Sequence, residues 1–296
     1  MKEIQISKIP FYIVDVFAEH KYEGNQLAVI ICNEDFPESL MQVIAKEMNY
    51  SETIFITSIE NYKVRIFTPE TELPFAGHPT LGGAYILGKE FIKEKVKTIS
   101  LDMKIGEIAV LFKYKGEEIS EVWMEQKQPV FSNYFSTEVL ANILRLNEED
   151  FDRRFQIQEV STGVPTIIVP LKTLAAVKKA KIDEEKYYEL VNKIQAKTIL
   201  IFCPEPIDKK NDLHVRFFAN YYGVPEDPAT GSGNGSLAAY LVNHEYFGKK
   251  IIDIKVEQGH EIGRPSLLLL RSEEKGGKYY ISVGGKVILV AKGELL

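Results

Sequence analysis

Cysteine is scarce in this sequence. Cys32 and Cys203 are the only two among 296 residues, so the chain has neither a disulfide framework nor a CxxC metal pattern. Both follow short apolar runs, which favours small buried residues over reactive thiols. The histidines other than His78 lack the spacing of zinc ligands; they are His20, His214, His244 and His260. Without paired cysteines or an apolar signal core, a cytoplasmic protein without a metal is expected.

Long hydrophobic runs and long basic runs are also missing. Apolar stretches such as 267–270 are only a few residues long, whereas a helix that spans a membrane needs about 20 apolar residues. The net charge is −6, and a surface that binds nucleic acid needs a basic stripe. We therefore expect neither a membrane nor a nucleic acid as a partner.

An internal repeat is the main feature that is present. VRIF begins at Val64 and VRFF begins at Val215, and each is followed by a loop with proline and acidic residues. A glycine-rich turn and a helix of small residues come next, so that 75–87 lies over 229–241. A repeat of this length predicts two like domains related by a pseudo-two-fold axis, with the equivalent loops facing one cleft.

The pattern of apolar residues predicts strands with a few helices. The expected strands are 11–18, 26–32, 52–58, 63–69, 97–103, 106–113, 119–125, 159–171, 198–204, 214–220, 251–259, 264–271, 278–285 and 287–295, and the expected helices are 37–50, 80–89, 181–194 and 234–247. This order favours an α+β fold over a doubly wound parallel sheet. The predicted domains are 1–125, with 286–296 as a candidate closing strand, and 126–285.

The two glycine-rich segments are candidate anion sites. Free N–H groups and the positive dipole end of a helix bind carboxylates well, and two equivalent copies favour this interpretation over glycines that only shape a turn. The string that begins at Gly231 has the spacing GxGxG, which differs from the GxGxxG of dinucleotide-binding loops. No cofactor is expected from it.

Three side chains near these segments are candidate catalytic groups. Glu52 starts an apolar strand, where a carboxylate acquires a raised pKa and can act as acid and base; an exposed glutamate is the simpler alternative. His78 lies inside the first glycine-rich segment and suits a proton carrier or a donor to substrate. Asp227 precedes Pro228 and the second segment, where a turn-capping aspartate is the alternative.

Four stretches together resemble the PhzF (phenazine-biosynthesis) family. They are SETIF from Ser51, AGHPTLG from Ala76, DPATGSGNGS from Asp227 and the EQG…GRPS stretch from Glu257. The resemblance implies a fold like that of diaminopimelate epimerase, in which each of two domains wraps strands around a central helix. It also implies a homodimer, no cofactor and a small carboxylate substrate. On this resemblance, the catalytic residues are Glu52, His78 and Asp227, and the substrate-binding residues are Gly77, Gly231, Ser232 and Gly233.

The related racemases use one cysteine in each loop, and here those positions are Ala76 and Thr230. A two-thiol mechanism is therefore excluded, whereas a proton shift by one carboxylate on one face of the substrate is compatible. Two other functions stay open at this point. One is a hydrolase with a triad of Ser232, His78 and Asp227, which lacks the GxSxG elbow. The other is a binding protein of the same fold without catalysis.

Overall fold

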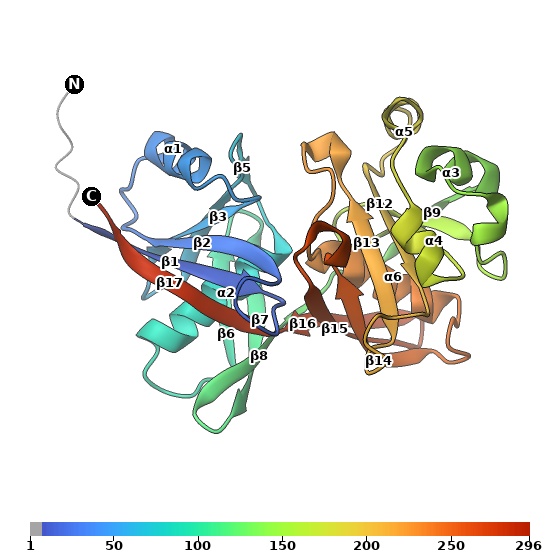
Figure 1. The fold of residues 1–296 in the computed structure, drawn as a ribbon. Coiled ribbons are helices and arrows are strands. Elements are labelled where there is room, and N and C mark those ends of the chain that lie inside the picture. Colours follow the sequence, from blue (N-terminus) through green and yellow to red (C-terminus); the bar gives the residue numbers. More distant parts are fainter. Residues whose placement is uncertain (1–7) are drawn as a thin grey trace. The chain divides into compact units, whose positions relative to one another are not determined.

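The structure is a computed structural model that describes residues 8–296 and divides into two compact units. The first unit contains the described residues up to Met124 together with Gly285–Leu296, and the second unit contains Glu125–Gly284. The first unit therefore includes a strand from the C-terminal end of the chain, whereas the second unit is one continuous segment (Figure 1). Within residues 8–296, no helix has the length and apolar character needed to span a membrane.

Strands of the first unit form a mostly antiparallel sheet. They are β1 (Ile9–Val16), β2 (Asn25–Ile31), β3 (Thr53–Ser58), β4 (Lys63–Phe67), β5 (Glu72–Leu73), β6 (Thr98–Met103), β7 (Gly106–Lys115), β8 (Glu118–Glu125) and β17 (Val287–Leu295). The order is β17-β1-β2-β3-β4-β6-β7-β8, in which the pairs β2–β3 and β4–β6 are parallel. In Figure 1 the red strand β17 runs along the blue strand β1.

The second unit repeats this order. Its strands are β9 (Val130–Phe135), β10 (Ile157–Ser161), β11 (Thr166–Pro170), β12 (Thr198–Cys203), β13 (Leu213–Phe218), β14 (Ile251–Gln258), β15 (Ser266–Lys275) and β16 (Lys278–Gly285). They pair in the order β9-β10-β11-β12-β13-β14-β15-β16, and the pairs β11–β12 and β13–β14 are parallel. The α+β class and the mostly antiparallel sheets predicted from the sequence are confirmed.

One helix of small residues lies against the sheet of each unit, and its side chains are almost all buried. These helices are α2 (Gly77–Ile86) and α6 (Gly231–Asn243). A Cβ atom on Gly82 would lie 2.4 Å from Cδ2 of Leu27, and one on Gly233 would lie 2.4 Å from Cε2 of Phe217. The strands approach so closely that a side chain at these positions would overlap its neighbours, which explains the small residues of the repeat.

The remaining helices lie on the outer faces or in connections. They are α1 (Glu38–Met48), α3 (Thr137–Leu144), α4 (Leu174–Lys179), α5 (Glu184–Val191), the π-helical turn Leu87–Phe91 and the 3₁₀ turns Glu148–Asp150, Asn220–Tyr222 and His260–Ile262. In the first unit α1 buries Met41 and Ala45 against Phe55 and Phe67. In the second unit α3, α4 and α5 contribute to a core with β11 and β12.

Many expected elements differ by a few residues at their ends, and four of them differ in a way that has a structural explanation. The helix expected over 234–247 begins at Gly231 and ends at Asn243, and the one expected over 80–89 begins at Gly77 and ends at Ile86. The expected strand 159–171 is two antiparallel strands, β10 and β11. The helix expected over 181–194 is the shorter α5. The glycines form the first helical turns because tight packing outweighs the low helix propensity of glycine.

Candidate active site

Glu52 and His78 lie together in the first unit. Glu52 immediately precedes β3, and His78 is the second residue of α2. Oε2 of Glu52 is 3.6 Å from Nε2 of His78, and their side chains are 19% and 6% exposed. This separation is too long for a direct hydrogen bond, and it lies within ion-pair distance for a protonated His78. The pair is therefore placed where both groups can contact one small molecule.

The surroundings of Glu52 favour its protonated form. Burial raises the pKa of the Glu52 carboxyl above its ordinary value, and the hydrogen bond with Ser51 lowers it by less. Transfer of a charged carboxylate out of water is unfavourable, so the neutral acid is stabilised relative to the anion. A carboxyl group with a raised pKa can both release and accept a proton near neutral pH.

The start of α2 suits an anion. Its N-cap residue, Ala76, has extended backbone and has no side chain that could accept from the first helical turn, and that turn carries no acidic residue. The N–H groups of a first turn point away from the helix and carry partial positive charge. A substrate carboxylate can therefore be held next to Glu52 and His78 by the helix start.

The equivalent segment of the second unit is built differently. The N-cap residue of α6 is Thr230, whose hydroxyl donates to Oδ2 of Asp227. The backbone N–H of Asp227 donates to the carbonyl of Phe217 over 3.0 Å. Gly231, Ser232 and Gly233 form the first turn of α6. Asp227 and the glycine-rich turn are thus parts of one local structure.

The side chain of Gln258 fixes this local structure through hydrogen bonds. Its side chain is fully buried. Its Nε2 donates to the carbonyl of Asp227 at 2.8 Å and to Oγ1 of Thr230 at 3.1 Å. Its Oε1 accepts from Nδ2 of Asn234 at 2.8 Å and from the backbone N–H of Thr230 at 3.4 Å. All four hydrogen bonds therefore end on the segment from Asp227 to Asn234.

Each unit also has a paired arginine and glutamate just before its glycine-rich segment. Arg65 donates from Nε and Nη2 to the two carboxylate oxygens of Glu72, both at 2.7 Å. Arg216 donates to the two oxygens of Glu226 at 2.9 and 2.7 Å. The guanidinium groups lie 5.2 and 4.8 Å from the ring centres of the phenylalanines two residues later in β4 and β13. The same contacts thus occur in both copies of the repeat.

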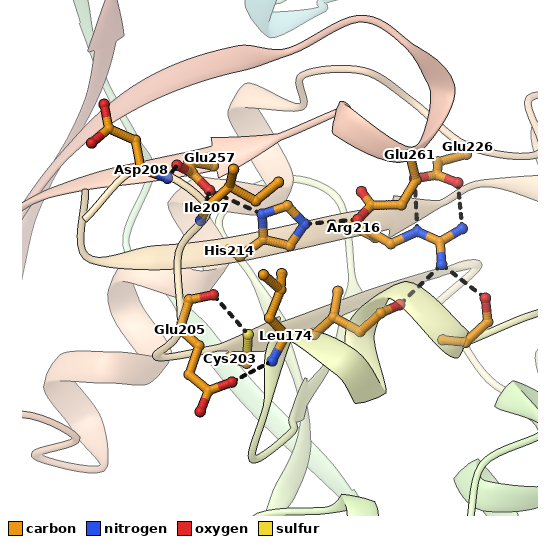
Figure 2. Close-up of polar contacts among 12 residues, drawn as sticks. Leu174, Cys203, Glu205, Ile207, Asp208, His214, Arg216, Glu226, Glu257 and Glu261 are labelled. Atoms are coloured by element: carbon orange, nitrogen blue, oxygen red, sulfur yellow. Dashed lines mark hydrogen bonds and ion pairs between the residues drawn. The ribbon is translucent and has the colours of Figure 1, made fainter. Parts of the chain in front are cut away.

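A second buried charged cluster lies next to Arg216 (Figure 2). His214 is fully buried between Glu257 and Glu261, with Nδ1 and Nε2 each 3.0 Å from a carboxylate oxygen. Burial alone lowers the pKa of His214, but the hydrogen bonds with both glutamates raise it overall. Burial raises the pKa of Glu257, yet hydrogen bonds from His214, Asn211 and two backbone N–H groups lower it to about 2. Both ring nitrogens of His214 thus face carboxylates, an arrangement that favours the protonated ring.

The surroundings of the two cysteines do not favour thiolate chemistry. Burial raises the pKa of both Cys32 and Cys203 to about 12, so neither is a thiolate at neutral pH. Cys203 is fully buried as expected, whereas Cys32 is partly exposed. Within residues 8–296, no group of three or more histidine, cysteine, aspartate or glutamate side chains is arranged to hold a metal ion.

The two units differ at the position of Glu52. Thr53 is opposite Phe67 in the β3–β4 ladder, and Ile199 is opposite Phe218 in the β12–β13 ladder. Because Phe67 and Phe218 are equivalent in the repeat, the residue that corresponds to Glu52 is Thr198. Its hydroxyl is 2.9 Å from that of Thr166. At this position of the repeat, only the first unit has a carboxylate.

The structure thus places the sequence-predicted residues in two groups. Glu52, His78 and Gly77 belong to the first unit, whereas Asp227, Gly231, Ser232 and Gly233 belong to the second. Sequence reasoning missed Gln258 as a partner of Asp227. It also missed the two arginines, although the repeated VRIF and VRFF contained the signal.

Comparison with known proteins decides the family. A family model described as "Phenazine biosynthesis-like protein" matches residues 14–293. The chain belongs to the PhzC-PhzF family. The resemblance recognised in the sequence is therefore confirmed.

Relatives of this PhzF protein are isomerases. "Uncharacterized isomerase YfhB" of Bacillus subtilis is 32% identical over 292 residues, which cover 97% of each chain. Trans-2,3-dihydro-3-hydroxyanthranilate isomerase of Pseudomonas chlororaphis is also 32% identical over 292 residues, which cover 97% of this chain and 99% of the relative. A solved PhzF-family structure from Bacillus anthracis has a TM-score of 0.89 at 28% identity and covers 98% of this chain and 100% of that chain. The prediction of an isomerase is confirmed.

Proposed function

We propose that this PhzF protein catalyses a cofactor-free proton shift on a small unsaturated amino or hydroxy carboxylate, with Glu52 as the acid and base. The observation that carries the proposal is the placement of the Glu52 carboxyl 3.6 Å from His78 and beside the start of α2. The raised pKa of Glu52 supports the same role, because the group must exchange a proton in both directions.

The proposed reaction needs no redox change. The carboxylate of Glu52 removes a proton from a carbon next to a double bond, and the electrons of that C–H bond form a new double bond. The electrons of the original double bond then accept the proton at its far carbon, from the same carboxyl group. Because one residue gives and takes the proton, the shift occurs on one face of the substrate.

Other groups bind and polarise the substrate in this proposal. The backbone N–H groups of Gly77, Gly231, Ser232 and Gly233 bind the substrate carboxylate and developing negative charge. His78 and Asp227 contact its hydroxyl or amino groups. Loss of one donor to the developing charge costs about 3 kcal/mol in the barrier, or roughly a hundredfold in rate.

Trans-2,3-dihydro-3-hydroxyanthranilate is the first substrate to test, because relatives that are about one-third identical carry the name of its isomerase. It has the carboxylate and the double bonds that the proposed reaction needs. A homodimer in the cytoplasm stays a prediction for this chain, and light scattering after size-exclusion chromatography tests the dimer.

Hydrogen exchange in D₂O tests the proposal directly. The wild-type protein and Glu52→Gln are incubated with trans-2,3-dihydro-3-hydroxyanthranilate and a panel of unsaturated amino and hydroxy acids, and NMR follows deuterium at carbon. We expect incorporation with the wild type and a loss of at least a hundredfold in Glu52→Gln. The matched control, Glu60→Gln, changes an exposed glutamate of the same unit and should retain full activity.

Two results would contradict the proposal. Exchange at the wild-type rate in Glu52→Gln would remove Glu52 from the reaction. Binding of a panel compound without any exchange by the wild type would favour a binding protein of the same fold.

A further inference from the structure

Thr230 occupies the N-cap position of α6 but does not cap the helix with its side chain. A threonine at this position ordinarily accepts a hydrogen bond from an N–H of the first turn. Here its hydroxyl donates to Oδ2 of Asp227 instead, and it accepts from Nε2 of Gln258. The hydroxyl therefore connects a buried amide to a carboxylate.

The direction of these hydrogen bonds is fixed by backbone groups. The carbonyl of Asp227 can only accept, so the atom of Gln258 that faces it must be the NH₂ group. The backbone N–H of Thr230 can only donate, so the other end of the Gln258 amide must be its oxygen. Asn234 agrees with this assignment, because its NH₂ group also donates to the carbonyl of Thr230. The orientation of the buried amide is thereby determined without reference to hydrogen positions.

This orientation leaves one arrangement for the hydroxyl of Thr230. A hydroxyl has a single hydrogen to donate. Since Gln258 donates to the oxygen of Thr230, the hydrogen of Thr230 is available for the carboxylate of Asp227. A hydrogen bond donated to a carboxylate favours its ionised form and fixes the direction of its oxygens.

We propose that Thr230 and Gln258 are positioning residues that orient Asp227 and hold it as an anion for contact with an amino or hydroxyl group of the substrate. The inference rests on the proposed function for the identity of that contact. The relay itself is carried by the hydrogen bonds of the second unit: Gln258 donates to Thr230, and Thr230 donates to Asp227.

The charged groups next to this relay along the chain have partners of their own. Glu226, which precedes Asp227, is bound by Arg216. Glu257, which precedes Gln258, accepts from Asn211 and contacts His214. The neighbouring carboxylates are thus bound by other side chains, and the hydrogen bond from the hydroxyl of Thr230 is the contact of Asp227 that a substitution at Thr230 removes.

Substitutions at Thr230 test the relay without substrate. Thr230→Val keeps the side-chain shape and removes the hydroxyl, whereas Thr230→Ser restores a hydroxyl. Carbon-13 NMR of labelled aspartate side chains, with the Asp227 signal assigned by Asp227→Asn, measures the midpoint of the Asp227 titration. We expect a rise on the order of one pH unit in Thr230→Val relative to the wild type, and a midpoint near the wild-type value in Thr230→Ser. Gln258→Glu, which removes the NH₂ donor, should also shift the midpoint upward.

Kinetics with trans-2,3-dihydro-3-hydroxyanthranilate provide the second measurement. We expect Thr230→Val to raise KM about tenfold with little change in kcat, because a binding contact is lost equally in the ground and transition states. Thr230→Ser should restore KM. The control Thr71→Val, at an exposed threonine of the first unit, should change neither parameter nor the Asp227 titration.

The two measurements separate the two proposals. An Asp227 midpoint that is identical in the wild type and in folded Thr230→Val overturns the relay, whatever the activity is. A wild type that does not act on the substrate panel overturns the proposed function, while the NMR titration still decides the relay. Circular dichroism in the near ultraviolet shows that each variant is folded.

Discussion

Arg65 and Arg216 make the same bidentate contact in the two units, each with a glutamate that stands five residues before the first glycine of the buried helix. The pair bridges the strand and the segment that leads into the helix, so it fixes where that segment departs from the sheet. The environments of the two arginines differ. Arg216 also donates to the carbonyls of Val177 and Ala180, whereas Arg65 reaches Glu38 at the surface.

This difference predicts unequal costs of substitution. Arg216→Ala leaves Glu226, whose side chain is only 9% exposed, and two helix carbonyls without their donors. We expect a loss of about 3–5 kcal/mol in the free energy of unfolding. Arg65→Ala should cost about 2 kcal/mol, because its side chain is 25% exposed and water can replace it. Urea denaturation measures both. Equal losses would contradict the assigned difference, and Arg→Lys at either position should recover only part of the loss, since lysine cannot make the bidentate contact.

Burial of Glu52, which suits its proposed catalytic role, should lower the stability of the folded protein at neutral pH. Its pKa is raised in the folded protein by burial, so the folded state binds more protons than the unfolded state between the ordinary value of 4.5 and the raised pKa. Stability therefore falls as pH rises through this window. We expect Glu52→Gln to be more stable than the wild type by about 0.5–2 kcal/mol at neutral pH, with the difference disappearing below pH 4.5. Thermal unfolding across this range checks the trend, and a gain that is independent of pH would refute it.

The buried cluster around His214 predicts a maximum of stability between two pH limits. His214 has a raised pKa, so its stabilisation is present at low pH and is lost as pH rises through the raised value. The pKa of Glu257 is lowered to about 2, so its contribution is present above 4.5 and is lost as pH falls toward 2. The cluster therefore stabilises the protein most between pH 4.5 and 6.5, and less as the pH rises further toward the raised pKa of His214.

His214→Ala tests this prediction. Removal of the cation leaves Glu257 and Glu261 facing each other, and we expect a loss of about 3–5 kcal/mol at neutral pH. The loss should shrink toward pH 4, where the two carboxyl groups can take up protons. Urea denaturation from pH 4 to 9 measures it, and His20→Ala is the control at an exposed histidine. A constant loss over this range would argue for packing alone.

Local sequence pattern predicted strands better than short helices. The strands expected at 278–285 and 287–295 have the observed bounds, because alternating apolar residues and a glycine turn define them. The helices α3 and α4 were missed because eight and six residues carry too short an apolar stripe to stand out. In α5 the buried residues are Tyr187 and Val191, while Tyr188 is 37% exposed.

The contacts of the candidate site could be predicted from the sequence only where the residues are close along the chain. The contact between Thr230 and Asp227 spans three residues and is accessible to sequence reasoning, as a turn. The role of Gln258 is not accessible to such reasoning, because Gln258 lies in a strand 28 residues after Thr230. The closeness of Glu52 and His78 was implied only by family resemblance, since it arises from the packing of α2 against β3. Their catalytic roles remain predictions until exchange is measured.

The pairing of β1 with β17 sets an order for assembly during synthesis. Val287 follows Val16 by 271 positions, although the two are direct neighbours in the ladder. A ribosome that adds about 5–20 residues per second makes β17 on the order of 15–55 s after β1. Through that interval the second unit can complete its own ladders, while the edge of β1 is open to chaperones or to the same strand of another nascent chain. The first unit to be translated is thus the last to close.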